Sequence, residues 1–110
     1  MNDLTKSQKK HLRQLAKDCF EKEMSLALEA LYQEFKKWEN EKITTWELND
    51  KVHEHQNKKA KQLGKLYEDI NDPRIALAQA VVKGIIKIED VQENCRPLLQ
   101  NLIDFYQNEN

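Results

Sequence analysis

Residues Thr5–Asn40 contain neither glycine nor proline, and this uninterrupted stretch limits what the chain can fold into. Apolar residues recur through it at three- and four-residue steps, which place their side chains on one face of a helix. They are Leu12, Leu15, Ala16, Cys19, Phe20, Met24, Ala27, Leu28, Leu31, Phe35 and Trp38. The pattern predicts one long amphipathic helix to which the rest of the chain must be fitted.

This helix is longer than the globule that a chain of 110 residues forms. It spans roughly 50 Å at about 1.5 Å per residue, whereas a compact chain of this size is roughly 35 Å across. The helix must therefore bend, project or be covered by a second copy. Its denser apolar seam runs from Met24 to Trp38 in 4-3-4-3 steps. We expect the second helix and the apolar Ile75–Val82 helix to pack there, leaving the basic first three turns uncovered.

Local capping signals mark where further helices begin. Thr5 followed by Gln8, and Thr44 followed by Glu47, each match a capping box, in which the two residues satisfy each other's free backbone N–H groups. A second helix is therefore expected from Thr45. The dipeptide Asp72–Pro73 predicts the start of a helix that is apolar nearly all round, and Gly84 predicts its end.

The polar segment 54–62 leaves two alternatives for residues 45–70: one helix with a wet middle, or two helices that meet near Asn57. We favour an interruption or kink near Asn57. A short helix at about 89–94 and a last helix from Pro97 complete the pattern. The sequence thus predicts a single all-α domain over residues 1–110, with four to five helices and the shorter ones packed against the long N-terminal helix.

Composition narrows the class of protein further. The net charge of −1 argues against a dedicated nucleic-acid-binding protein, which is usually strongly basic. The charge is nevertheless uneven, because residues 1–65 carry 14 Lys+Arg against 11 Asp+Glu and residues 66–110 carry 4 against 8. No apolar run approaches the roughly 20 residues of a membrane span, and no signal peptide is recognisable. Cys19 and Cys95 are far apart and outside any Cys-x-x-Cys motif, so we expect buried, reduced thiols and a cytoplasmic protein.

Two short motifs resemble a group of small, uncharacterised bacterial all-helical proteins. They are Glu-Leu followed by Val-His-Glu, within Trp46–Glu54, and a helix that ends in Gly-Ile, within Val82–Ile86. The resemblance covers about residues 38–90 and implies a helical fold without implying an activity. Members of the group place a second histidine where this chain has Gln56, and a Gly-Pro break where it has Asn57-Lys58.

The sequence offers little support for catalysis or for a cofactor. Asp50 and His53 share a helical face and form one half of a di-iron carboxylate site, but no second Glu/Asp-x-x-His motif supplies the other half. Nucleophile motifs and glycine-rich phosphate loops are missing. We therefore expect a non-enzymatic protein without a cofactor, and a metal-dependent enzyme is only the third hypothesis. Asp50 is then a polar partner of His53.

Protein–protein interaction is the function that the sequence favours. Tyr32, Trp38 and Trp46 are candidate anchors, because aromatic residues are enriched at interface hot spots. The alternative is that these three rings only pack the junction of the first two helices. We expect an interaction or regulatory module, either a homo-oligomer, most simply a dimer, or the partner of another protein.

The second hypothesis is a nucleic-acid-associated regulator, or the small partner of a two-protein system. It uses a basic face on the first helix, which consists of Lys6, Lys9, Lys10, Arg13 and Lys17. A solvated helix face is the simpler explanation for these residues.

Overall fold

The structure, a computed structural model, describes residues 4–67 and 72–109. Its helices are, in chain order, α1 (Lys6–Glu39), α2 (Thr45–Glu54), a π-helical segment (His55–Ala60), α3 (Lys61–Tyr67), α4 (Arg74–Val82) and α5 (Arg96–Glu109). Two short 3₁₀ turns, Ile88–Asp90 and Glu93–Cys95, replace the helix expected at 89–94. None of the described residues lies in a β-strand. The prediction of an all-α fold with a long N-terminal helix is confirmed.

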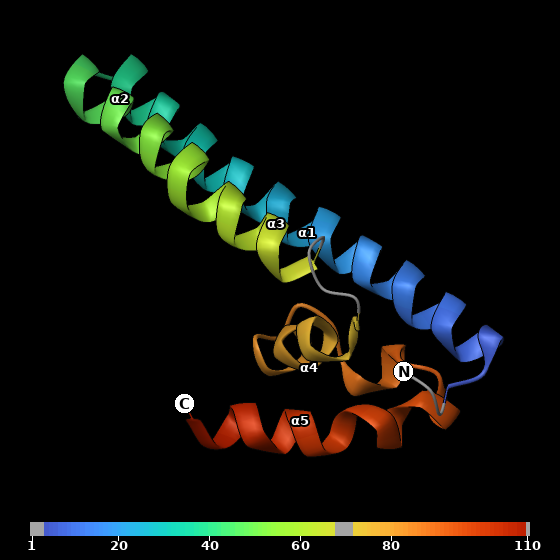
Figure 1. Cartoon of the computed structure of the whole chain (residues 1–110). Helices are drawn as coiled ribbons and strands as arrows, with labels where there is room; N and C mark the ends of the chain where they lie inside the picture. Colours follow the sequence, from blue (N-terminus) through green and yellow to red (C-terminus); the bar gives the residue numbers. More distant parts are fainter. Residues whose placement is uncertain (1–3, 68–71, 110) are drawn as a thin grey trace.

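Helices α1, α2 and α3 form a long antiparallel hairpin (Figure 1). The chain does not break near Asn57. It remains helical from Thr45 to Tyr67, and the π-helical segment takes the place of the expected interruption. A π-helix closes i→i+5 hydrogen bonds and is therefore wider than the α-helix on either side of it. The expected end of this helix, near residue 70, lies outside the described residues.

The molecule measures 54 × 24 × 21 Å, and the hairpin extends well beyond the rest of it. The C-terminal half of α1 and the antiparallel α2 project together away from α4 and α5, as Figure 1 shows. We call this part the arm: residues 24–39 of α1, α2 and the π-helical segment. Of the three ways to accommodate a helix that is longer than its globule, the molecule uses projection.

The core lies against the N-terminal half of α1, where α4 packs on α1 and α5 packs on α4 (Figure 1). The expectation that α4 packs on the Met24–Trp38 seam is therefore wrong, and so is the expectation that the first three turns of α1 are left uncovered. Leu12 is completely buried there. The buried residues of this cluster are Leu4, Leu12, Ala16, Cys19, Leu77, Ala78, Ala80, Val91, Cys95, Leu99 and Ile103.

The predicted local signals are used, with one exception at the start of α4. Thr5 and Gln8 form a capping box at the start of α1, and Thr44 and Glu47 form one at the start of α2. Helix α4 begins at Arg74, as expected, but its N-cap residue is Pro73 and not the expected Asp72. Asp72 Oδ1 accepts a hydrogen bond from the backbone N–H of Arg74 at 3.0 Å just before the helix. Gly84 has a φ of 78° and follows α4 as a left-handed residue.

Candidate interaction surfaces

The arm carries an exposed row of large apolar side chains on α1. The row consists of Leu28, Tyr32, Phe35 and Trp38, which are 50%, 53%, 37% and 40% exposed, and we call it the arm stripe. Their 4-3-3 spacing places them on one side of the helix. Helix α2 covers a neighbouring side of α1, so the stripe is the flank that the hairpin leaves open.

Two predicted anchors, Tyr32 and Trp38, belong to this stripe, and the third lies beyond it. Trp38 donates a hydrogen bond from Nε1 to Thr45 Oγ1 at 3.2 Å, which fixes its ring at the hairpin tip. The Lys36 ammonium lies 4.8 Å from the centre of the Tyr32 ring. Trp46 is 79% exposed at the start of α2. Trp38 therefore lies at the junction of the first two helices, as the alternative expects, whereas Tyr32 and Trp46 are more than half exposed.

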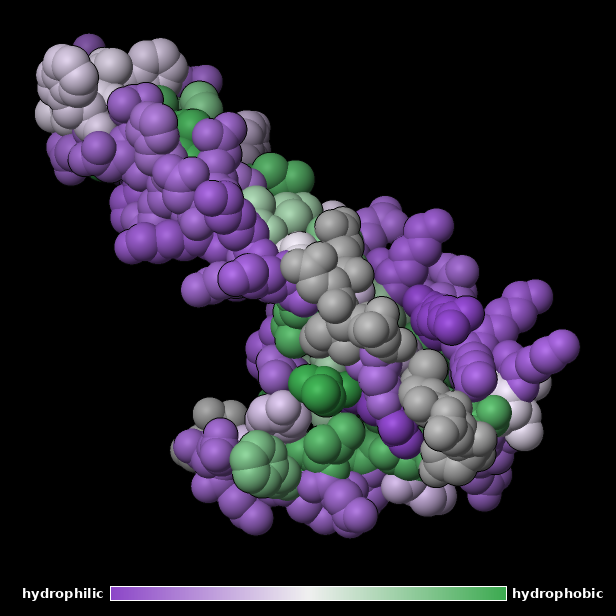
Figure 2. Space-filling model, viewed as in Figure 1, coloured by the Kyte–Doolittle hydropathy of each residue, from purple (hydrophilic) through white to green (hydrophobic). Residues whose placement is uncertain are grey.

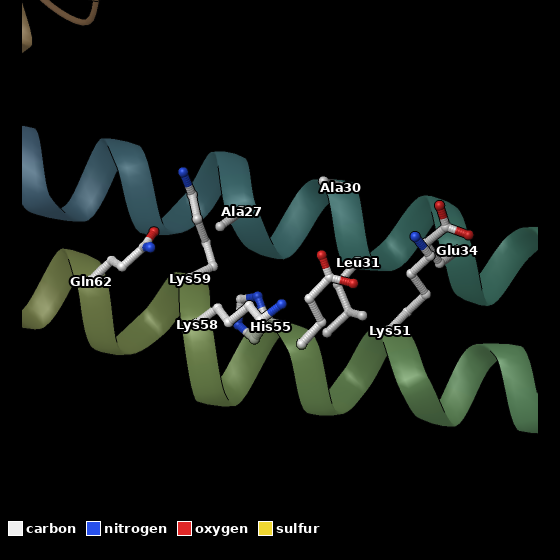
Figure 3. A pocket seen from close by; sticks show the side chains of 10 residues that line it. Ala27, Ala30, Leu31, Glu34, Lys51, His55, Lys58, Lys59 and Gln62 are labelled. Atoms are coloured by element: carbon white, nitrogen blue, oxygen red, sulfur yellow. The ribbon is translucent and has the colours of Figure 1, made fainter.

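On another flank of the arm, α1 and the π-helical segment border a cleft of about 420 Å³ (Figure 3). The α1 side of the cleft is lined by the small side chains of Ala27 and Ala30 together with Leu31. Opposite them, Figure 3 shows His55 between the helices and Lys59 extending beside Ala27. The alanines leave room that larger residues would fill, so this part of the hairpin is loosely packed.

The cleft wall is mainly basic. Lys51, Lys58 and Lys59 line it, and none of them forms an ion pair with a residue that the structure describes. Glu34 and Glu54 also line it, and Glu34 is already paired with Lys37 outside the cleft at 3.1 Å. Figure 2 shows the corresponding band of hydrophilic side chains along the arm.

A partly buried polar cluster joins the arm to the core. Glu23 of α1 is 5% exposed and accepts hydrogen bonds from the Tyr67 hydroxyl and from Lys83 Nζ, the latter at 2.6 Å. We call these three residues the neck. The Phe20 and Tyr67 rings meet edge to face there at 5.7 Å. Burial raises the pKa of Tyr67 well above its usual range, and the hydrogen bond and charge of Glu23 act in the same direction.

The sequence pattern did not predict the neck, although the position of Glu23 on α1 is a signal for it. Glu23 stands between Cys19 and Ala27 in a run of four-residue steps, so it occupies a position on the buried side of α1. A carboxylate at such a position needs partners, because an unpaired buried charge is strongly destabilising. The partners are Tyr67 of α3 and Lys83, which directly follows α4, and only the folded structure brings them to Glu23.

The predicted basic face lies on the N-terminal half of α1, directed away from the core. Lys6, Lys10, Arg13 and Lys17 are exposed, and Lys9 is half-buried beside them. Together with Gln14, these five residues line a shallow groove of about 390 Å³ along the helix.

The predicted polar pair is not built into a site. Asp50 and His53 are both exposed on α2, and no hydrogen bond joins them in the described part of the chain. Across residues 4–67 and 72–109, no group of three His, Cys, Asp or Glu side chains is placed to hold a metal ion. Cys19 and Cys95 are free and buried. Burial, followed by the charges of nearby carboxylates, raises the pKa of Cys19 to about 11.

Comparisons of the chain with protein-family models, with curated proteins and with solved structures find no match. Within the described ranges, no helix is long and apolar enough to cross a membrane. A function must therefore be argued from the surfaces themselves.

Proposed function

We propose that the protein is a non-enzymatic interaction module that pairs with a second copy of itself through the arm stripe. The observation that carries this proposal is the exposure of Leu28, Tyr32, Phe35 and Trp38 on a projecting hairpin. Two such hairpins, laid with their stripes together, form a four-helix arrangement in which each stripe is covered. The two free, buried thiols fit a reducing compartment such as the cytoplasm.

The size of the stripe suits a small interface. Aromatic side chains carry roughly 150–250 Å² each, so the exposed fractions of its three rings and Leu28 leave about 300 Å² open. That value is within the range of about 300–600 Å² for the largest apolar patch of a monomer, which is often functional. A standard interface buries roughly 800 Å² per partner, so the stripe would form the apolar centre of a modest one.

The charges beside the stripe favour an antiparallel arrangement of the two copies. Glu29 and Lys36 are seven residues apart and flank the stripe on the same side. When two copies of α1 pair antiparallel about Tyr32, Glu29 of one copy lies opposite Lys36 of the other. The twofold symmetry of a dimer repeats this pair, which favours the antiparallel register over a parallel one.

Two substitutions on the same helix test the proposal. Leu28→Glu places a charge in the stripe, and Leu26→Glu places the same charge on a leucine that is 54% exposed. The two positions lie about 200° apart around α1, so only the first should affect pairing. In sedimentation experiments at high micromolar concentration, we expect the wild type and Leu26→Glu to approach twice the 13.1 kDa monomer mass.

For Leu28→Glu we expect a loss of about 2 kcal/mol per substituted side, which weakens association at least 30-fold and leaves monomers. Circular dichroism should show equal helix content in both variants, since both leucines are exposed. A strictly monomeric wild type at these concentrations contradicts the proposal. Equal weakening by the two substitutions also contradicts it, because the stripe would then have no special role.

A further inference from the structure

The basic face of α1 contains a straight row of cations that the arm does not use. Lys6, Lys10, Arg13 and Lys17 follow one another in 4-3-4 steps, which align their side chains along one line of the helix. We call these four residues the basic row. Not one acidic residue occurs between Lys6 and Lys17. In the described part of the chain, none of the four forms an ion pair.

The fold holds this row in a fixed, outward position. Leu12 and Ala16, on another side of the same turns, are buried in the core cluster that also contains residues of α4 and α5. The capping box of Thr5 and Gln8 secures the first turn of the helix. Figure 2 shows hydrophilic side chains standing out from the surface over this end of α1. The helix backbone thus holds the four charged side chains in a line, although the whole chain is close to neutral.

We propose that the basic row binds the phosphate backbone of double-stranded nucleic acid without sequence preference. The eleven residue steps from Lys6 to Lys17 span about 17 Å of helix, which matches roughly five successive phosphates of one strand at 3.4 Å each. Four cations in the row, with Lys9 beside them, face a similar number of phosphates. A groove of about 390 Å³ runs between these side chains and gives the backbone a shallow seat.

The neighbouring residues favour a duplex over other polyanions. Single strands are usually held by aromatic side chains on which bases stack, and residues 6–17 contain no Phe, Tyr or Trp. A membrane-surface helix directs apolar residues into the lipid on one face. The apolar residues of this part of α1 are buried in the core cluster together with residues of α4 and α5. Its solvent-facing side therefore presents charged side chains and no apolar face to a membrane.

The salt dependence of binding measures how many phosphates are contacted. With a fluorescently labelled DNA duplex of mixed sequence, the slope of log Kobs against log salt should be about −4 for four to five contacts. Affinity at physiological salt should lie in the non-specific range, with a Kd of roughly 10⁻⁴ to 10⁻⁶ M. A second duplex of different sequence should bind equally well.

Two matched double substitutions assign the contacts. Lys6→Gln/Lys10→Gln removes two members of the row and should make the slope shallower by about 2. Lys61→Gln/Lys65→Gln removes the same charge at the same spacing from exposed residues of α3, and should leave the slope unchanged. Both changes lie on exposed faces, and circular dichroism checks that both variants fold.

Three results would overturn the proposal. The first is the absence of salt-dependent binding to any duplex. The second is an equal effect of the two double substitutions, which would mean that overall charge, not the row, determines binding. The third is binding to vesicles of anionic phospholipid without binding to DNA, which would assign the row to a membrane surface.

Discussion

Replacing Lys83 with methionine should reveal how much the neck contributes to stability. Glu23 has two hydrogen-bond donors, the Tyr67 hydroxyl and Lys83 Nζ, and its side chain is only 6% exposed. Lys83→Met removes the positive charge and leaves the buried carboxylate with the hydroxyl alone. Methionine keeps most of the apolar stem, so the change tests the ion pair more than the packing.

The expected loss follows from the burial of the two partners. Removing one partner of a buried ion pair costs about 3–5 kcal/mol, because the other charge stays buried without compensation. The Lys83 side chain is 40% exposed, so water screens part of the interaction and we lower the expected cost to about 2 kcal/mol. For a domain of this size, that loss lowers Tm by roughly 10 °C.

A double-mutant cycle separates the ion pair from other effects of the substitution. Glu23→Gln keeps an acceptor for Tyr67 but removes the charge that requires Lys83. In that background Lys83→Met should be nearly neutral, which gives a coupling energy of about 1–2 kcal/mol between the two residues. Urea denaturation of the four proteins measures it. Lys87→Met, at an exposed lysine of the same region, is the control and should stay within about 0.5 kcal/mol of the wild type.

A coupling energy below about 0.5 kcal/mol would refute the reasoning, since additive effects are what independent sites show. The same conclusion follows if Lys87→Met is as destabilising as Lys83→Met. In either case the neck would be a surface contact whose geometry contributes little to the free energy of unfolding.

Two further predictions concern groups whose pKa values the fold raises. The pKa of Cys19 is raised from 9.0 to about 11, so its buried thiol stays protonated. At about pH 8, a disulfide reagent should therefore react at least 100-fold more slowly with Cys19 in the folded protein than in the unfolded chain. Rapid labelling without denaturant would contradict this. The raised pKa of Tyr67 means that its stabilising effect is complete below the unfolded value of 10.0 and is lost as pH rises above that value. Urea midpoints should therefore fall more steeply above about pH 10 for the wild type than for Tyr67→Phe, and parallel curves would refute the assignment.

The sequence predicted those features that depend on a few neighbouring residues. The capping boxes at Thr5 and Thr44 and the left-handed Gly84 each act within one turn of chain, so their residue types alone specify them. Residue type alone makes Tyr32 and Trp46 candidate interface anchors, but it does not predict that their rings are exposed. Whether a ring is covered depends on helices that are distant in sequence.

The π-helical segment shows the limit of a purely local interpretation. Residues 54–62 lack an apolar helical face, and this pattern predicts a break or kink near Asn57. A helix can accommodate such a segment without ending, by widening one turn and keeping its apolar residues in register on either side. Leu48 and Leu63 are both buried on the two sides of the widened turns. Periodicity alone does not distinguish a break from a widened turn.

Helix lengths explain why the N-terminal half of α1 is buried and the arm stripe is not. The return leg of the hairpin, from Thr45 to Tyr67, runs about 35 Å back along α1 at 1.5 Å per residue. It ends beside Phe20 and Glu23, where the Tyr67 ring and hydroxyl make their contacts. Beyond that point α1 still has an apolar face, at Leu12 and Ala16, that the return leg cannot reach.

The chain after the hairpin supplies α4, the two 3₁₀ turns and α5, and residues of α4, the turns and α5 join Leu12 and Ala16 in the core cluster. The Met24–Trp38 seam is denser in sequence, but one flank of it is already covered by α2. No described helix is left for the other flank, so the arm stripe remains exposed within one copy of the chain. The same lengths that place α4 on the N-terminal half of α1 therefore create the surface through which we propose that two copies pair.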